Sequence, residues 1–374
     1  MDKEIKKKLL RKLSYQEMED LISGATILGC GGGGDPKVSK AMVDEIFEQG
    51  KEFSLLDPKT LRDESWVCIL GYVGGGLEQK ERDLVKDLKK IWKHPISIAS
   101  KELENYLKIE FDSYLPSEIG AGNTVTPMFI AAMEGKTTID GDAAGGRAKP
   151  ELIISTTNLL GIPITPLAIT TYFGDCLILQ NSESDDRVEK ICRYLARVSG
   201  GRVGVARCPA KGKEMQKAIH PYSISLAINA GRVIKEEKEK PVEALLGVLK
   251  GSKRFEGYVE SFFREERDGF MWGDINLKGR KDFEGEIFKI WFKNENLVSW
   301  RDRKLDITCP DAIIIVDSEN GEGLYNWGDH FYKGRQVTVI GVRSIGIWKS
   351  KEGLEIFGPK HFGFDFSYRK INDW

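Results

Sequence analysis

Five of the six residues from Gly29 to Gly34 are glycine, within the stretch ILGCGGGGDPKVSK (residues 27–40). Because glycine loses more conformational entropy on folding than any other residue, such a run is costly unless the backbone must turn tightly or approach another group closely. Asp35 and Pro36 follow the run and are typical of the start of a helix. Unpaired backbone N–H groups before a helix are suited to binding an anion or a carbonyl oxygen. The run therefore predicts either a ligand-binding loop or a tight junction.

The same run satisfies the pattern G-x-G-x-x-G, and Asp57 lies where the dinucleotide-binding motif has its ribose-binding acid. The match is unspecific, because a run of glycines satisfies many patterns and the residues before it follow a helical pattern rather than a strand pattern. No G-K-[ST] sequence follows, which excludes a P-loop. We therefore expect neither NAD nor FAD as a cofactor.

Local patterns predict alternating helices and strands in the first half of the chain. Ser14 and Glu17 have the spacing of a capping box before an amphipathic stretch. Residues 66–72 are almost continuously apolar, which is typical of a strand covered on both faces, and Gly74 to Gly76 follow them. Further helices are expected over the basic residues 1–13 and over residues 77–92 and 121–136.

After Lys253 the chain alternates between apolar and polar residues in short stretches separated by Gly, Asn or Asp, which predicts strands. The expected fold is an α/β N-terminal domain with glycine-rich loops at strand ends, plus a C-terminal portion containing a β-barrel or, alternatively, a sandwich. We assign residues 1–172 to the α/β domain and residues 173–374 to a mixed segment that leads into the β-rich domain. In open α/β sheets, ligands bind beyond the carboxyl ends of the strands.

Composition excludes several classes of function. Lys and Arg number 56 and Asp and Glu 57, so no global positive field favours nucleic acid. Apolar stretches are too short to span a bilayer as a helix. Six well-separated cysteines without a CxxC pair argue against a zinc cluster or a disulfide scaffold. We therefore expect a cytoplasmic protein with a small-molecule substrate and no nucleic-acid or membrane partner, and a homo-oligomer stays open.

Polar residues gather in two nearby segments, PSEIGAGNTVTP (116–127) and IDGDAAGGRAKPE (139–151). Asp140 and Asp142 lie two residues apart and point the same way in an extended stretch. Two such carboxylates suit general acid–base catalysis, because one pKa is pushed up, or they bind a hard cation such as Mg, Ca or Mn. Arg147 could instead form a structural ion network with them, or clamp a substrate carboxylate. A solvated loop is the remaining alternative.

Five segments together resemble the S-methyl thiohydantoin desulfurase domain family, long catalogued without a function and often linked with hydantoin utilisation. They are ILGCGGGGDP, EIGAGNTVTP, IDGDAAGGRAKPE, CPDAIIIVDSENGEGL and GPKHFGFDFSY, and the resemblance spans about Leu13 to Tyr368. It implies an α/β N-terminal domain and a C-terminal portion with a β-barrel. It also implies a hydrolase that removes the sulfur substituent from an S-methylated five-membered thiohydantoin ring.

The chemistry of that reaction suggests a role for each polar candidate. Water attacks the sulfur-bearing ring carbon, an acid takes its proton, a second acid protonates the ring nitrogen, and main-chain amides stabilise the developing charge. The candidates are Asp142 or Glu118 as base, Asp140 as acid, Gly31, Gly32, Gly33 and Gly34 for the ring carbonyl, Asn123 for the ring amide and Arg147 for a substrate carboxylate. A divalent metal held by Asp140 and Asp142, or a covalent route through Cys30, are variants.

A second hypothesis makes the chain a non-catalytic module that binds a nucleotide or small acid, or a partner subunit of a hydantoinase-type enzyme. In that case the glycine loop holds a phosphate and the acids are structural.

Overall fold

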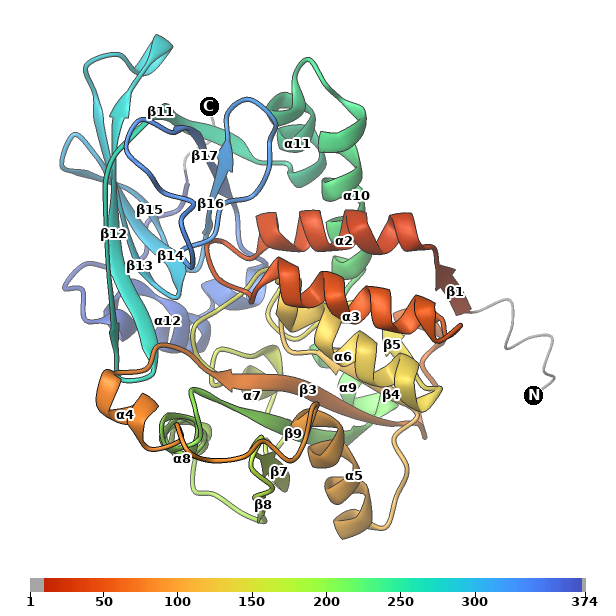
Figure 1. Cartoon of the computed structure of the whole chain (residues 1–374). Coiled ribbons are helices and arrows are strands. Elements are labelled where there is room, and N and C mark those ends of the chain that lie inside the picture. Colours follow the sequence, from red (N-terminus) through yellow and green to blue (C-terminus); the bar gives the residue numbers. More distant parts are fainter. Residues whose placement is uncertain (1–9, 372–374) are drawn as a thin grey trace.

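The computed structural model describes residues 10–371 and contains two β-sheets with helices packed around them (Figure 1). The helices are α2 (Tyr15–Leu28), α3 (Pro36–Glu48), α4 (Gln79–Asp83), α5 (Pro95–Leu107), α6 (Ala121–Glu134), α7 (Thr156–Leu159), α8 (Asp185–Val198), α9 (Gly212–Ala218), α10 (Ser223–Glu236), α11 (Pro241–Leu249) and α12 (Lys351–Phe357).

The first sheet has eight strands in the order β1-β2-β5-β4-β3-β9-β7-β8. They are β1 (Leu10–Leu13), β2 (Phe53–Leu56), β3 (Trp66–Gly74), β4 (Ser113–Pro116), β5 (Thr137–Ile139), β7 (Leu167–Thr170), β8 (Cys176–Leu179) and β9 (Arg202–Lys211). Strands β2, β5, β4 and β3 run parallel, and the remaining pairs are antiparallel. Two-residue strands β6 (Gly141–Asp142) and β10 (His220–Pro221) form a separate pair.

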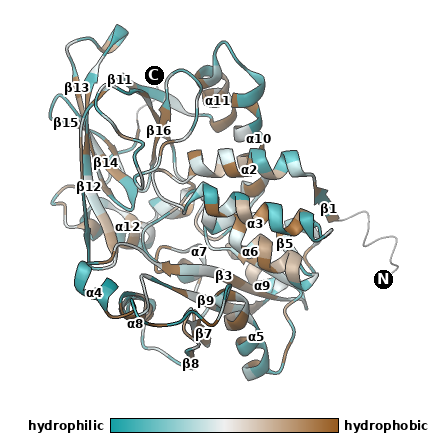
Figure 2. Ribbon diagram, viewed as in Figure 1, coloured by the Kyte–Doolittle hydropathy of each residue, from teal (hydrophilic) through white to brown (hydrophobic). Residues whose placement is uncertain are grey.

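Strand β3 is buried on both faces, as its apolar sequence predicted. Cys68 and Leu70 belong to the core that β3 shares with α5 and α6, whereas Val67 and Ile69 belong to the core on the α8 and α9 side. Adjacent side chains of a strand point to opposite faces, so a strand between two helical layers must be apolar throughout. The helices that cover the sheet carry both hydrophilic and hydrophobic residues (Figure 2).

Helix starts follow their local signals. The Ser14 hydroxyl accepts from the amide of Glu17 at 3.2 Å while the Glu17 carboxylate accepts from the amide of Ser14 at 2.9 Å, which confirms the capping box. The Asp35 carboxylate accepts from the amide of Lys37 at 2.8 Å, and Pro36 is the first residue of α3. These helices therefore begin where the sequence indicates.

Two predicted helices differ from the structure. Only residues 79–83 of the stretch 77–92 are helical, and Leu84, Leu88 and Ile91 are exposed. A short amphipathic helix needs a surface on which to bury its apolar face, and this stretch lacks one. In the predicted helix 1–13, residues 10–13 instead form the edge strand β1, which pairs with β2. Residues 1–9 lie outside the described part of the chain.

The second sheet is antiparallel throughout, with the strand order β15-β14-β13-β12-β11-β17-β16. Its strands are β11 (Ser252–Arg267), β12 (Phe270–Gly279), β13 (Ile287–Lys293), β14 (Glu295–Arg301), β15 (Lys304–Thr308), β16 (Ala312–Asp317) and β17 (Gln336–Val342). It curls but does not close, because its two edge strands β15 and β16 are not paired with each other.

The predicted β-barrel is therefore an open half-barrel, and its edges are covered in other ways. A Cβ on Gly323, which bridges to Val316 of β16, would lie 2.7 Å from the amide nitrogen of Ile27 in α2. At the other edge, Thr308 of β15 exchanges hydrogen bonds with the backbone of Arg369 in the C-terminal tail. A helix and a tail protect the strand edges that barrel closure would have paired.

The segment after residue 172 contributes to both sheets, because β8 and β9 belong to the first sheet and β11 to β17 form the second. The predicted boundary at residue 172 stays a prediction. Within residues 10–371, no helix combines the length and the apolar character needed to cross a membrane.

Candidate functional site

The glycine run forms the connection between α2 and α3 and packs directly against the start of α6. A Cβ on Gly33 would lie 2.6 Å from the Cα of Gly120, and one on Gly34 would lie 2.8 Å from the Cα of Gly122. The carbonyl of Gly33 accepts from the amides of Gly122 and Asn123 at 2.9 and 3.1 Å. Both Gly33 and Gly34 have positive φ angles, 84° and 92°. A close approach between two backbones thus explains part of the run.

The other end of the run is attached to the second sheet. The carbonyl of Cys30 accepts from the amide of Asn296 at 2.7 Å, and the carbonyl of Gly31 accepts from the amide of Asn326 at 2.7 Å. Within residues 10–371, no hydrogen bond uses the amides of Gly33 and Gly34. The loop therefore joins the two halves of the molecule and leaves two amides unused.

A cavity of about 460 Å³ lies beside this loop, within the size range of small-molecule sites. Its lining combines the end of β3, the loop after β4, the segment 149–152 and the β13–β14 turn. The lining residues that can take part in chemistry have polar side chains or free backbone amides. They are Glu118, Asn123, Lys149, Glu151 and Glu295, together with Gly33 and Gly34. Four of the predicted site residues, Glu118, Asn123, Gly33 and Gly34, are thus brought together.

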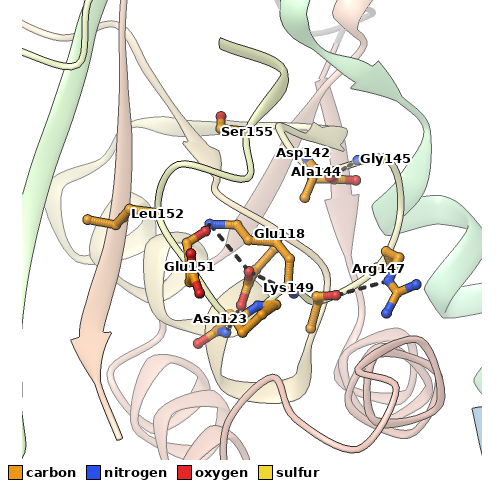
Figure 3. Close-up of polar contacts among 12 residues, drawn as sticks. Glu118, Asn123, Asp142, Ala144, Gly145, Arg147, Lys149, Glu151, Leu152 and Ser155 are labelled. Carbon is orange, nitrogen blue, oxygen red and sulfur yellow. Dashed lines mark hydrogen bonds and ion pairs between the residues drawn. The ribbon is translucent and has the colours of Figure 1, made fainter. Parts of the chain in front are cut away.

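Glu118 follows β4 and is held by three groups (Figure 3). Its carboxylate accepts from the side-chain amide of Asn123 and from the backbone amide of Lys149 at 3.2 Å. The ammonium group of Lys149 lies 3.6 Å away and also donates to the carbonyl of Glu151 at 2.9 Å. Burial raises the pKa of Glu118, and the Lys149 cation opposes this shift. Burial lowers the pKa of Lys149, although the negative charge of Glu118 acts in the opposite direction.

Glu295 is the second buried acid of the cavity. It lies at the start of β14, and its Oε1 atom would be 1.9 Å from a Cβ on Gly32, so a larger residue at position 32 would displace the Glu295 carboxyl. Its Oε2 atom has no hydrogen-bond partner within residues 10–371. Burial, and then the negative charge of Glu118, raise the pKa of Glu295 well above its ordinary value. Of the two acids, Glu295 is therefore the one whose surroundings favour the protonated form more strongly.

Asp140 and Asp142 do not line this cavity. The carboxylate of Asp142 accepts from the backbone amides of the next loop, from Ala144 at 2.5 Å and from Gly145 and Gly146 at 2.8 Å each. Asp140 accepts from the amide and hydroxyl of a different residue, Ser225, at 3.0 and 2.5 Å. The two carboxylates thus have separate partners, and burial raises the pKa of each. Their catalytic role stays a prediction.

Arg147 is buried, and its guanidinium donates four hydrogen bonds to backbone carbonyls. It donates at 2.9 Å to the carbonyls of both Pro310 and Asp311 and at 3.1 Å to the carbonyl of Ala148, and it lies 5.1 Å from the ring centroid of Phe357. Arg147 does not line the cavity and lies between the first-sheet loop and the second sheet. Its role as a clamp for a substrate carboxylate stays a prediction.

The metal and thiol variants have limited support from the geometry. In the part of the chain that the structure describes, no group of three or more His, Cys, Asp or Glu side chains is arranged to hold a metal ion. Cys30 is buried at the edge of the glycine run, donates to the carbonyl of Leu28 at 3.4 Å, and has its pKa raised by burial. A nucleophilic thiol normally has a lowered pKa.

Sequence reasoning missed Lys149 and Glu295. Lys149 belongs to the segment that drew attention through Asp140 and Asp142, but one lysine in a polar loop carries no separate signal. Glu295 lies in the sequence KNEN, where an acid between two asparagines is typical of a solvated turn. Only the packing of this turn on the glycine run buries it.

Comparisons with known proteins cover nearly the whole chain. The family model described as "S-Me-THD-like, N-terminal domain" matches residues 16–181, and the model described as "S-Me-THD-like, C-terminal domain" matches residues 183–371. No curated protein matches the sequence. The X-ray structure of a protein from Chromobacterium violaceum is similar, with a TM-score of 0.80 and 21% identity over 97% of this chain and 100% of that one. This likeness shows a shared fold. The chain belongs to the S-methyl thiohydantoin desulfurase-like (S-Me-THD-like) family.

Proposed function

We propose that this protein is a hydrolase that acts on a hydantoin-like five-membered ring and removes a sulfur substituent from it. The family membership supports the ring chemistry, and the cavity supports the hydrolysis. The observation that carries the proposal is the pair of buried carboxyl groups, Glu118 and Glu295, which line one cavity and differ in their environments. Acids whose surroundings push their pKa values apart are typical of an acid–base pair.

The two acids can run both halves of the reaction. Glu118, whose ionised form is favoured by Lys149 and Asn123, takes a proton from water as the water oxygen bonds to the ring carbon that carries the S-methyl group. Glu295 gives its proton to the ring nitrogen, so the C=N double bond becomes a single bond. In the second half, the new hydroxyl returns a proton to Glu295 and becomes a carbonyl. The C–S bond breaks, and methanethiol leaves with the proton from Glu118.

Other cavity groups orient the ring. The unused amides of Gly33 and Gly34 line the cavity and are suited to the ring carbonyl, where each donor is worth about 3 kcal/mol in the transition state. The side-chain amide nitrogen of Asn123 is bonded to Glu118, so its oxygen is left for a ring N–H. Lys149 acts on Glu118 and not on the ring, because its ammonium group faces Glu118 and the carbonyl of Glu151.

The direct experiment mixes purified protein with S-methyl thiohydantoins of several substituents and detects the released thiol with a dye. We expect methanethiol, and a loss of at least about 100-fold in kcat/KM for Glu118→Gln and for Glu295→Gln. Glu256→Gln is the matched control, because Glu256 is a buried acid of the second sheet that pairs with Lys281 outside the cavity. Absence of thiol with every substituent would contradict the proposal.

The alternative function, a non-catalytic module that binds a nucleotide or small acid, can be tested separately. A thermal-shift screen measures which compounds bind the native state. Stabilisation by nucleotides together with no response to hydantoins would favour the binding module.

A further inference from the structure

The cavity has four cationic side chains, and three of them already have acceptors within the protein. Arg82 pairs with Glu266 at 2.5 Å, and Lys149 lies near Glu118. Arg193 pairs with Glu189 at 2.5 Å and donates to the carbonyls of Gly74, Gly269 and Pro150. These three side chains are therefore committed to holding the cavity wall.

Arg202 differs from them. It is exposed at the start of β9, opposite Gly74 at the end of β3. Its guanidinium carbon lies 5.1 Å from the ring centroid of Tyr72 and 5.5 Å from that of Tyr172, two rings that are stacked 6.2 Å apart. No carboxylate or carbonyl within residues 10–371 accepts a hydrogen bond from it. Cation–π contact with the two rings holds the guanidinium in place without using its N–H donors.

The pairing of charges in the cavity favours an anionic ligand at Arg202. Three acids of the lining each lie beside a cation: Glu118 beside Lys149, Glu151 beside Lys293 and Glu266 beside Arg82. Within residues 10–371, no carboxylate forms an ion pair with Arg202. A ligand with one negative charge would supply the partner that this arginine lacks.

We propose that Arg202 binds a carboxylate on the ring substituent of the substrate, so the substrate class is a hydantoin-like ring with an acidic side chain. This inference rests on the proposed function. Guanidinium and carboxylate groups match in shape and form two parallel hydrogen bonds. Arg202 thus takes the role that the sequence suggested for Arg147, whose guanidinium donates to backbone carbonyls.

The topology allows one small molecule to reach both places. Strands β3 and β4 are parallel neighbours, so both end at the same edge of the first sheet. Glu118 follows β4, and Arg202 lies beside the end of β3. A bare five-membered ring would leave much of the 460 Å³ empty, whereas a ring with a side chain spans from the acid pair toward the stacked tyrosines.

Isothermal titration tests the inference without relying on turnover. The probes are hydantoin-5-acetic acid and its neutral primary amide, which has nearly the same shape. Wild-type protein should bind the acid at least about 10-fold more tightly than the amide, since a hydrogen bond to a charged group is worth about 1.5–3 kcal/mol. Arg202→Gln should remove the preference and Arg202→Lys should keep part of it. Arg187→Gln, at an exposed arginine of α8 outside the cavity, should leave the preference unchanged.

The possible results distinguish a failure of the Arg202 proposal from a failure of the proposed hydrolase function. Equal affinity for acid and amide, or a preference that persists in Arg202→Gln, overturns the role of Arg202 and leaves the hydrolase proposal intact. An Arg202-dependent preference without thiol release from any S-methyl substrate supports the anion site and overturns the hydrolase. No binding of either probe overturns the role of Arg202, and thiol release from the S-methyl substrates then decides the hydrolase proposal by itself.

Discussion

Replacing Glu295 with glutamine should strongly slow turnover and stabilise the protein at the same time. Glutamine has nearly the same shape but cannot release a proton, so the ring nitrogen loses its acid. Removing a general acid typically costs about 100- to 10,000-fold in rate. The stability change has the opposite sign, because Glu295 is buried and its Oε2 atom has no partner within residues 10–371.

The stability effect follows from proton binding. In the unfolded chain Glu295 releases its proton near the ordinary value of 4.5, whereas burial and the charge of Glu118 raise its pKa well above that in the folded protein. Above pH 4.5 the unfolded state therefore binds fewer protons, so rising pH destabilises the fold until pH passes the folded pKa. Each unit of separation is worth about 1.4 kcal/mol at neutral pH. Glutamine does not titrate and escapes this penalty.

Chemical denaturation of the wild type and Glu295→Gln at pH 4 and pH 7.5 measures the effect. The variant should gain at least about 1 kcal/mol over the wild type at pH 7.5 relative to their difference at pH 4. Thiol release by the same samples should show the lost turnover. Retained turnover refutes the acid role of Glu295, and a difference between the proteins that does not change with pH refutes the raised pKa.

Three further predictions concern the glycine run, Asp142 and two cysteines. Gly33→Ala should lose about 1–3 kcal/mol more unfolding free energy than Gly50→Ala, because both have positive φ but only Gly33 faces another backbone, whereas nothing lies near Gly50; equal losses in urea denaturation would contradict the close packing. Asp142→Asn should cost about 1–3 kcal/mol of stability, since three amides share its carboxylate, with kcat/KM of the folded protein kept; full stability with lost turnover would support its predicted catalytic role. Iodoacetamide should label the exposed Cys176 in the native protein and spare the buried Cys30, as peptide mass spectrometry can show; fast labelling of Cys30 would revive the covalent route.

Local signals in the sequence correctly predicted the structural features that depend only on residues close together in the chain. The caps formed by Ser14 and Asp35 and the doubly buried strand β3 each involve a few adjacent residues, and all three occur in the structure. The family was recognised from short motifs, and the family models confirm it. Prediction failed where distant segments decide, as in the open half-barrel, whose edge strands are covered by α2 and the C-terminal tail.

The candidate site shows the same limit. Glu118 and Asn123 are five residues apart, lie around the start of α6 and were predicted together. Glu295 reaches them from a turn in the other half of the chain, and the sequence alone gives no distance between the two. Nothing in the sequence shows that the carboxylate of Asp142, the predicted base, accepts from three amides of the loop that follows it.

The most direct test is a crystal structure of the slow variant Glu295→Gln soaked with an S-methyl thiohydantoin. The account predicts electron density for the ring inside the cavity, with its sulfur-bearing carbon facing Glu118 and its carbonyl near the amides of Gly33 and Gly34. Ring density beside Asp140 and Asp142, with none in the cavity, would contradict it.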